Sequence, residues 1–188
     1  MSSEDIEKLR PGVVLQATGI VLEIGFGSGL NLPFYKNITK LYALEPSSEL
    51  ANMAKGRVGN VSFPVEFLNQ KAENILLPDS SVDSVVSTWT FCSLSNPEQV
   101  VKEIKRVLRP NGKFMFIEHG SSPKSWVRFV QNSLTPITKH FTGNCHMNRN
   151  IPRIIENGGF SIENLEQFHK KFKPFFHYYQ GVSSKDNF

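Results

Sequence analysis

The stretch VLEIGFGSGLNLPFY, residues 21–35, places three glycines within five residues, directly after an apolar run. Glycines at this density weaken a helix or a strand, so the chain must need their conformational freedom or their bare backbone. The apolar run predicts a strand over Ile20–Ile24, and the glycines predict a tight loop that leads into a short helix over Leu30–Tyr35. What lies against this loop is therefore the first question about the function.

Strands and helices alternate along the rest of the chain. Apolar, β-branched runs predict six further strands, at Lys40–Leu44, Val61–Leu68, Val82–Ser87, Lys113–Glu118, Phe160–Glu166 and Phe175–Val182. Apolar residues at helical spacing predict helices at Glu4–Ala17, Ser48–Lys55, Pro97–Leu108 and Asn148–Asn157. This alternation predicts an α/β fold with a Rossmann-like, doubly wound sheet of seven mainly parallel strands. The last two strands are joined by a connection too short for a crossover helix, so they are expected to form an antiparallel hairpin.

Length and composition narrow the class of protein. A chain of 188 residues suits a single domain over residues 1–188, with residues 1–19 as a helical cover and residues 121–146 as an insertion. The formal charge of +4 is spread along the chain, so no nucleic-acid partner is expected. The first residues lack the apolar segment of a signal peptide, and no apolar run approaches the length of a membrane span. We therefore expect a cytoplasmic protein.

A ligand is expected beside the glycine loop. In open parallel sheets, ligands bind beyond the carboxyl ends of the strands, where the strand order reverses. The loop Gly25–Gly29 belongs at that edge, and the helix N-terminus that follows it offers free N–H groups. Glu45 follows the first glycine by 20 residues and ends the second predicted strand, where it can accept hydrogen bonds from both hydroxyls of a ribose. Together, these two signals predict a cofactor of the adenosine type.

The glycine spacing distinguishes between two such cofactors. The dinucleotide fingerprint is G-x-G-x-x-G, whereas this chain has G-x-G-x-G with Leu30 at the position of the third glycine. Glu23 also lies within the strand, where a carboxylate would repel a pyrophosphate and attract a cation. S-adenosylmethionine carries a sulfonium and an ammonium and no phosphate. The local charges therefore favour S-adenosylmethionine over NAD, and a dehydrogenase is the weaker alternative.

Several motifs resemble a known family. VLEIGFGSG (residues 21–29), ALEPS (43–47), LPDSSVDSVVS (77–87) and EIKRVLRPNGKFMFIEHG (103–120) resemble the motifs of class I S-adenosylmethionine-dependent methyltransferases of the UbiE-type branch, methyltransferase domain 11. The resemblance runs in order from about Leu22 to Gln180. Within this branch, residues 90–120 and 143–160 are most similar to a methyltransferase-like group whose animal members are membrane-associated thiol methyltransferases.

The resemblance implies a set of cofactor-binding residues in the loops that follow the first four strands. Glu23 and the glycines would surround the methionine part, Glu45 would bind the ribose, and Pro46 and Ser47 would flank the adenine. The full implied set is Glu23, Gly25, Gly27, Gly29, Asn31, Glu45, Pro46, Ser47, Ala72, Glu73, Thr88 and Trp89.

Methyl transfer from a sulfonium depends mainly on holding the nucleophile and the methyl group in line. A thiol or phenol acceptor would gain from a nearby base, and His119 and His146 are the candidate catalytic residues. Residues 121–146 place large apolar side chains at helical spacing between Pro123 and Pro136. This segment is expected either to form a lid over an apolar acceptor, with a possible contact to a membrane surface, or simply to cap the sheet.

We expect a small-molecule acceptor, with a thiol favoured. A quinone or lipid-like acceptor is the alternative, and a non-catalytic S-adenosylmethionine-binding domain is the alternative of another class. The two cysteines suggest neither a disulfide scaffold nor a metal site. Cys92 is expected to be a packed, small apolar residue. The pair Cys145-His146 resembles half of a metal site but lacks a second pair at ligand spacing, so no metal is predicted.

Overall fold

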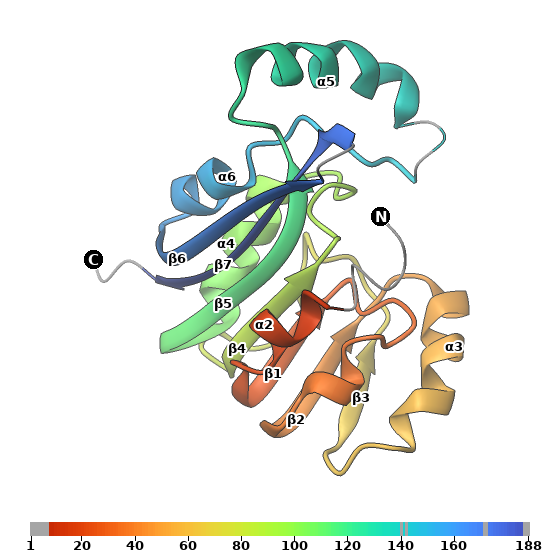
Figure 1. Ribbon diagram of the computed structural model, residues 1–188. Helices are drawn as coiled ribbons and strands as arrows, with labels where there is room; N and C mark the ends of the chain where they lie inside the picture. Colours follow the sequence, from red (N-terminus) through yellow and green to blue (C-terminus); the bar gives the residue numbers. More distant parts are fainter. Residues whose placement is uncertain (1–7, 140, 142, 171–172, 186–188) are drawn as a thin grey trace.

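The structure is a computed structural model that describes residues 8–139, 141, 143–170 and 173–185. Seven strands form one sheet in the order β3-β2-β1-β4-β5-β7-β6 (Figure 1). The strands are β1 (Thr18–Ile24), β2 (Asn37–Leu44), β3 (Val65–Leu68), β4 (Val82–Thr88), β5 (Leu108–Gly120), β6 (Phe160–Lys170) and β7 (Lys173–Lys185). The helices are α2 (Arg10–Val14), the 3₁₀ turn η1 (Leu32–Phe34), α3 (Ser48–Val58), α4 (Pro97–Val107), α5 (Ser125–Thr138) and α6 (Ile151–Asn157).

The direction of the strands agrees with the expected doubly wound fold. β1 pairs in parallel with both β2 and β4, and the parallel pairing continues outward from β2 to β3 and from β4 to β5. β7 lies antiparallel to both β5 and β6, which confirms the predicted C-terminal hairpin. The strand order reverses between β1 and β4, so the carboxyl ends of these two strands form the switch point at which ligands bind in such sheets.

The two faces of the sheet carry separate apolar cores. Leu22 and Ile24 of β1 pack on the side of α4 and α6, while the intervening Val21 packs on the side of α2 and α3. Successive side chains along a strand point to opposite faces of the sheet. Because helices cover both faces of a parallel sheet, the side chains on both faces are buried. Burial of both faces fixes the strands and so fixes the position of the loops at their ends.

Helix α4 illustrates how the sequence sets an element boundary. The side chain of Asn96 accepts a hydrogen bond from the Gln99 N–H (3.0 Å), and Pro97 occupies the first helical position, as predicted. Along the helix a buried apolar stripe faces the sheet: Val100, Val101, Ile104 and Val107.

Some predicted boundaries are wrong. The N-terminal helix was expected over Glu4–Ala17, but in the described part of the chain it covers only Arg10–Val14, and β1 already begins at Thr18. The third strand begins at Val65 rather than Val61, and α6 begins at Ile151, after the capping Asn150. Residues 1–7 lie outside the described residues.

Two predicted chain breakers do not break their elements. Residues 109–112, Arg-Pro-Asn-Gly, have a composition typical of a turn, but they lie within β5. There the pairing with β4 shifts register and Asn111 adopts a positive φ of 64°. Pro136 lies inside α5 rather than at its end. β6 and β7 also extend beyond their expected limits: β6 continues to Lys170, and β7 runs from Lys173 to Lys185.

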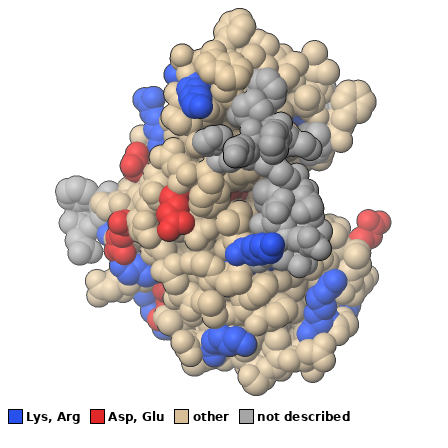
Figure 2. Space-filling view, viewed as in Figure 1, with Lys and Arg blue, Asp and Glu red and all other residues tan. Residues whose placement is uncertain are grey.

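The surface shows no concentration of one charge on the face seen in Figure 2, among the residues described there. α5 stands apart from the sheet, beyond the carboxyl end of β5 (Figure 1). No helix in the described ranges combines the length and the apolar character that crossing a lipid bilayer requires.

Candidate functional site

The glycine loop after β1 is shaped by two different demands. Gly25, Gly27 and Gly29 all adopt positive φ, between 58° and 79°, a backbone conformation that residues with a side chain rarely adopt. A Cβ atom at Gly25 would also lie 2.1 Å from the hydroxyl oxygen of Thr90, so this position is closed by packing. At Gly27 the nearest protein atom would be 3.9 Å away. The loop therefore keeps one bare, accessible stretch of backbone at Gly27.

Glu45 ties this loop to the neighbouring helix. One carboxylate oxygen accepts a hydrogen bond from the Gly27 N–H (2.9 Å), and the other accepts one from the Ser47 N–H (2.9 Å). Ser47 in turn caps α3 by accepting from the Leu50 N–H. The predicted ribose acid thus lies beside the glycine loop, as expected for one binding site, while Pro46 beside it is exposed.

Glu23 lies in a buried polar network rather than at an open surface. Its two carboxylate oxygens accept hydrogen bonds from the Asn31 amide (2.9 Å) and from the Tyr35 hydroxyl (2.7 Å). The Asn31 amide nitrogen also donates to the Thr88 hydroxyl (3.1 Å), and the Arg10 guanidinium donates to the side-chain amide oxygen of Asn31, Oδ1 (2.5 Å). Glu23 and Asn31 are both fully buried. In this arrangement they support the loop from below, and their direct contact with a cofactor stays a prediction.

Burial changes the acidity of Glu23. Desolvation raises its pKa from about 4.5 to about 7, although the hydrogen bonds from Tyr35 and Asn31 and the charge of Arg10 oppose the shift. The carboxyl group is therefore protonated over a wider pH range in the folded protein than in the unfolded chain.

The loop after β4 completes this edge of the sheet. Trp89 has a positive φ of 55°, which is rare for a large side chain and typical of functional sites. The Arg10 guanidinium lies 5.0 Å from the centre of its ring. Of the other predicted cofactor residues, Ala72 is buried in the core on the α4 side. Glu73 accepts a hydrogen bond from the Asn96 N–H (3.3 Å), so it also contacts the start of α4.

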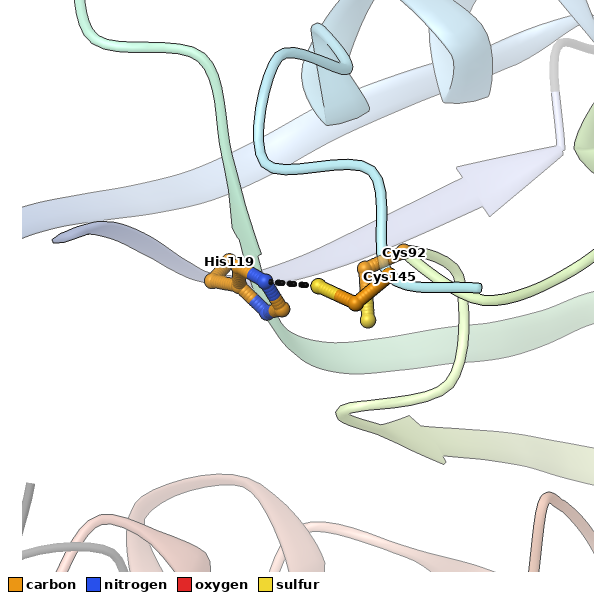
Figure 3. Close-up of side chains that lie close together, drawn as sticks. All are labelled: Cys92, His119 and Cys145. Atoms are coloured by element: carbon orange, nitrogen blue, oxygen red, sulfur yellow. Dashed lines mark hydrogen bonds between the residues drawn. The ribbon is translucent and has the colours of Figure 1, made fainter. Parts of the chain in front are cut away.

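A side-chain cluster that the sequence did not predict lies at the ends of β4 and β5 (Figure 3). It consists of Cys92 from the loop after β4, His119 near the end of β5, and Cys145 from the segment between α5 and α6. The two sulfur atoms and a ring nitrogen all lie within 4.8 Å of one another, and the His119 Nε2 is 2.7 Å from the Cys145 sulfur. The three residues are far apart in the sequence, so no spacing motif revealed them.

The two thiols differ in acidity because they share a hydrogen bond. Contact with Cys145 and burial raise the pKa of the Cys92 thiol, while contact with Cys92 lowers the pKa of the Cys145 thiol. Burial would lower the pKa of His119, but contact with Cys92 and the nearby Glu118 outweighs burial and raises it.

The loop that carries Cys92 is held by a buried carboxylate. Glu118 accepts hydrogen bonds from the backbone N–H groups of Thr90 (3.0 Å) and Phe91 (3.1 Å) and from the Ser87 hydroxyl (2.8 Å). Complete burial raises the pKa of Glu118 to about 7 despite these hydrogen bonds. From the other side, the Arg149 guanidinium donates to the carbonyl oxygens of Phe91 and Leu94.

His146 lies next to this cluster in the chain. Its Nδ1 faces two carbonyl oxygens, those of Asn144 (2.7 Å) and Cys92 (3.3 Å). Because carbonyl oxygens only accept hydrogen bonds, Nδ1 must carry the hydrogen, and Nε2 is the basic nitrogen. Both predicted catalytic histidines, His119 and His146, are therefore brought to the same edge of the sheet as the glycine loop.

Helix α5 turns its apolar residues outward. Its buried stripe contains Val127, Gln131 and Thr135, and the Gln131 side chain binds the Gly120 carbonyl oxygen (3.1 Å) and the Ser122 N–H (2.8 Å). The outer side and the residues just beyond it expose large apolar side chains, namely Trp126, Phe129, Leu134, Ile137 and Phe141. The apolar wall that the sequence predicts thus faces away from the sheet.

A groove of about 600 Å³ also lies between α5, α6 and the C-terminal hairpin. Its walls are mostly polar and include Arg128, Arg153 and Glu156. None of the predicted cofactor-binding or catalytic residues lines it, so we do not assign the site there.

Comparison with known proteins decides the family. Residues 22–116, half of the chain, match the family described as methyltransferase domain. The chain belongs to this methyltransferase family. Membership implies S-adenosylmethionine as the cofactor, which agrees with the glycine spacing, with the open backbone at Gly27 and with the adjacent Glu45.

Two curated relatives bear on the chemistry. The chain is 36% identical over 157 residues to the thiol S-methyltransferase TMT1B of Rattus norvegicus. The aligned region covers 81% of this chain and 64% of the relative. It is 32% identical over 118 residues to the phosphatidylethanolamine N-methyltransferase of Cereibacter sphaeroides. This aligned region covers 62% of this chain and 58% of the relative. The chain thus spans less than two thirds of the length of either methyltransferase.

A solved structure confirms the fold. A crystal structure described as a putative methyltransferase from Bacillus halodurans superposes with a TM-score of 0.78, covering 98% of this chain and 100% of the other, at 18% identity. At this identity the likeness concerns the fold alone. It confirms the Rossmann-like architecture for this methyltransferase.

The first prediction concerns Glu45. Glu45→Ala should weaken binding of S-adenosylhomocysteine by roughly 2–4 kcal/mol, because two charge-assisted hydrogen bonds to the ribose would be lost. Isothermal titration calorimetry measures the change. Glu49→Ala, which removes an exposed carboxylate from the first turn of α3, is the matched control and should leave the affinity unchanged. A folded Glu45→Ala protein with wild-type affinity would remove Glu45 from the binding site.

The second prediction concerns the buried carboxyl of Glu23. Between pH 4.5 and about 7 the unfolded chain loses this proton while the folded protein keeps it, so the free energy of unfolding should fall as the pH rises through that window. Glu23→Gln stays neutral and should reduce this fall by up to roughly 3 kcal/mol. Urea unfolding at pH 5 and pH 8 measures the difference.

The exposed Glu98→Gln serves as its control and should retain the wild-type pH dependence. The account of Glu23 is contradicted if Glu23→Gln loses as much stability as the wild type between the two pH values.

Proposed function

We propose that this methyltransferase transfers a methyl group from S-adenosylmethionine to the sulfur of a small, apolar thiol. The observation that carries the proposal is the 36% identity to a thiol S-methyltransferase over 81% of this chain. The cluster of ring nitrogen and sulfur atoms at the ends of β4 and β5 agrees with an acceptor site for soft sulfur chemistry.

The cofactor would lie across the ends of β1, β2 and β4. Its adenosine part would bind to Glu45 and Ser47, and its methionine part would lie against the open backbone at Gly27. When bound, S-adenosylmethionine supplies an electrophilic methyl group on a sulfonium that leaves as a neutral thioether. Glu23 and Asn31 hold the loop in place through the buried network beneath it.

The residues of the chain would orient the acceptor and accept its proton. A thiol becomes a strong nucleophile only as the thiolate, so a base at the acceptor site accelerates the reaction. His146 fits this role, because its Nδ1 is held by carbonyl oxygens and its Nε2 is left as the basic nitrogen. His119 is the second candidate, and its Nε2 contacts Cys145.

The outer side of α5 would contact a lipid surface. Phe129 and Ile137 are 72% and 62% exposed, and Lys124 and Arg128 lie at the start of the same helix, where they can meet anionic headgroups. Apolar acceptors collect in membranes, so a helix at the entrance of the site that rests on the membrane would raise their local concentration.

Two other functions have support of their own. Similarity to a phosphatidylethanolamine N-methyltransferase favours a lipid amine, and similarity at 30% identity over 101 residues to a ubiquinone/menaquinone C-methyltransferase from Campylobacter jejuni favours a quinone. A non-catalytic binding domain is disfavoured, since the glycine loop, Glu45 and both histidines are present together.

The third prediction is the acceptor class. In a screen of alkyl and aryl thiols, phenols, quinols and amines, production of S-adenosylhomocysteine should be fastest with apolar thiols, because a thiolate is the best nucleophile near neutral pH. Mass spectrometry should locate the methyl group on sulfur. Turnover restricted to phospholipid amines or quinols would contradict the proposed acceptor, and cofactor binding without turnover on any acceptor would favour the binding domain.

The fourth prediction concerns α5. The double variant Phe129→Ser and Ile137→Ser should bind vesicles of phosphatidylcholine and phosphatidylserine about tenfold more weakly, because two large apolar side chains no longer enter the bilayer. The affinity for S-adenosylhomocysteine should stay within about twofold, since the cofactor half is untouched. Leu76→Ser is the matched control, because Leu76 is equally exposed but lies before β4. Equal vesicle binding by the wild type and the double variant would contradict a membrane role for α5.

A further inference from the structure

Three potential metal ligands converge at the acceptor end of the sheet. Cys92, His119 and Cys145 present their sulfur and nitrogen atoms to a common point, with all ligand atoms within 4.8 Å of one another (Figure 3). Both cysteines of the chain lie in this cluster. Cys92 is buried and Cys145 is half-buried, so the cluster is enclosed on the side of Cys92 and more open on the side of Cys145.

The donor set favours zinc. Two thiolates and one imidazole suit Zn²⁺, and catalytic zinc sites use three protein ligands of this kind with a fourth position open. Zinc–ligand distances of about 2.0–2.3 Å imply separations of about 3.5–3.8 Å between ligand atoms in a tetrahedron. The observed separations, 2.7 Å for the His119–Cys145 pair and at most 4.8 Å overall, differ from these values by roughly 1 Å. Side-chain rotation can make up that difference without moving the backbone.

We propose that Cys92, His119 and Cys145 bind a zinc ion, and that the fourth position of this zinc takes the acceptor thiol. The inference deepens the proposed function, on which the role of the fourth ligand rests. The metal site itself rests only on the geometry of the three side chains.

The backbone around the cluster is fastened so that the three ligands stay together. The His146 N–H donates to the Cys92 carbonyl oxygen (2.8 Å), and the Asn144 amide donates to the Ser93 carbonyl oxygen (3.2 Å). These bonds join the segment of Cys145 to the loop of Cys92. Glu118, next to His119, binds the same loop from the β5 side. Such supporting contacts orient metal ligands and are part of a metal site.

The loop that carries Cys92 also contacts the glycine loop. The Thr90 hydroxyl donates to the carbonyl oxygen of Ile24, the residue before the first glycine (3.2 Å), and packs against Gly25. Cys92 follows Thr90 by two residues. A thiol on the zinc would therefore lie beside the part of the glycine loop that is expected to hold the methionine portion of the cofactor.

The reaction at this site balances without a further reagent. The acceptor thiol binds zinc as a thiolate, and its proton passes to the base proposed above, Nε2 of His146, because His119 serves as a zinc ligand at this site. A sulfur lone pair then forms a bond to the methyl carbon, while the bond from that carbon to the sulfonium sulfur breaks and its electron pair stays on the departing sulfur. The methylated product is a neutral thioether, a weak ligand, so it leaves the zinc. The metal serves to keep the acceptor sulfur ionised and in place.

The proposed site is tested by measuring metal in the protein directly. Protein purified under reducing conditions without chelator should contain about one zinc per chain by inductively coupled plasma mass spectrometry. Cys92→Ser, Cys145→Ser and His119→Ala should each lower the affinity for zinc at least about tenfold, since each removes a ligand. His146→Gln is the matched control, because His146 adjoins Cys145 in the chain, and it should keep the zinc.

A second readout tests the fourth position. Protein loaded with Co²⁺ in place of zinc should show thiolate-to-cobalt charge transfer and intense tetrahedral bands, and these should shift when an apolar thiol is added but not when its phenol analogue is added. Cys145→Ser keeps this test decisive if the buried Cys92→Ser variant does not fold, because Cys145 is only half-buried.

The outcomes separate the two proposals. Protein without zinc, or zinc content that the three variants leave unchanged, overturns the metal site, as does binding of copper in place of zinc. Methylation of thiols at an unchanged rate by metal-free protein overturns the role of zinc and leaves the proposed function standing. The protein could bind zinc and yet methylate no thiol, with a cobalt spectrum that thiols do not alter. This outcome would overturn the proposed acceptor but not the metal site.

Discussion

The buried carboxylate of Glu118 holds the loop on which both halves of the site depend. Its three hydrogen bonds, to the Ser87 hydroxyl and to the N–H groups of Thr90 and Phe91, fix the chain as it leaves β4. Thr90 then packs against Gly25 of the glycine loop, and Cys92 joins the cluster with His119 and Cys145. Burying a carboxyl group without hydrogen-bond partners costs free energy. The hydrogen bonds that Glu118 accepts offset this cost.

A second constraint acts on the other side of the switch point. Glu45 draws the Gly27 backbone and the N-terminus of α3 together, and the buried network of Glu23, Asn31 and Arg10 supports the loop from below. The cofactor side is thus stabilised largely by hydrogen bonds to rigid elements. By contrast, α5 stands away from the sheet and exposes its apolar residues.

The sequence predicts those helices, strands and loops that are marked by a local chemical signal. The glycines after β1, the acid at Glu45 and the proline that begins α4 are local signals of this kind, and each is found at the position that the sequence predicts. Interactions between distant residues were not predictable in this way. Asn111 and Pro136 look like chain breakers, yet β5 and α5 continue through them. Nothing in the sequence around His119 indicates that it meets Cys92 and Cys145.

The proposed function requires that this member of the methyltransferase family transfers the methyl group to sulfur. Its most direct test is a single-turnover reaction with S-adenosylmethionine carrying a labelled methyl group, offered an equimolar mixture of an aryl thiol and the phenol of the same shape. The account predicts that the label is recovered as the S-methyl thioether, with little O-methyl ether. Recovery of the label on oxygen, or no transfer by protein that binds S-adenosylhomocysteine, would contradict it.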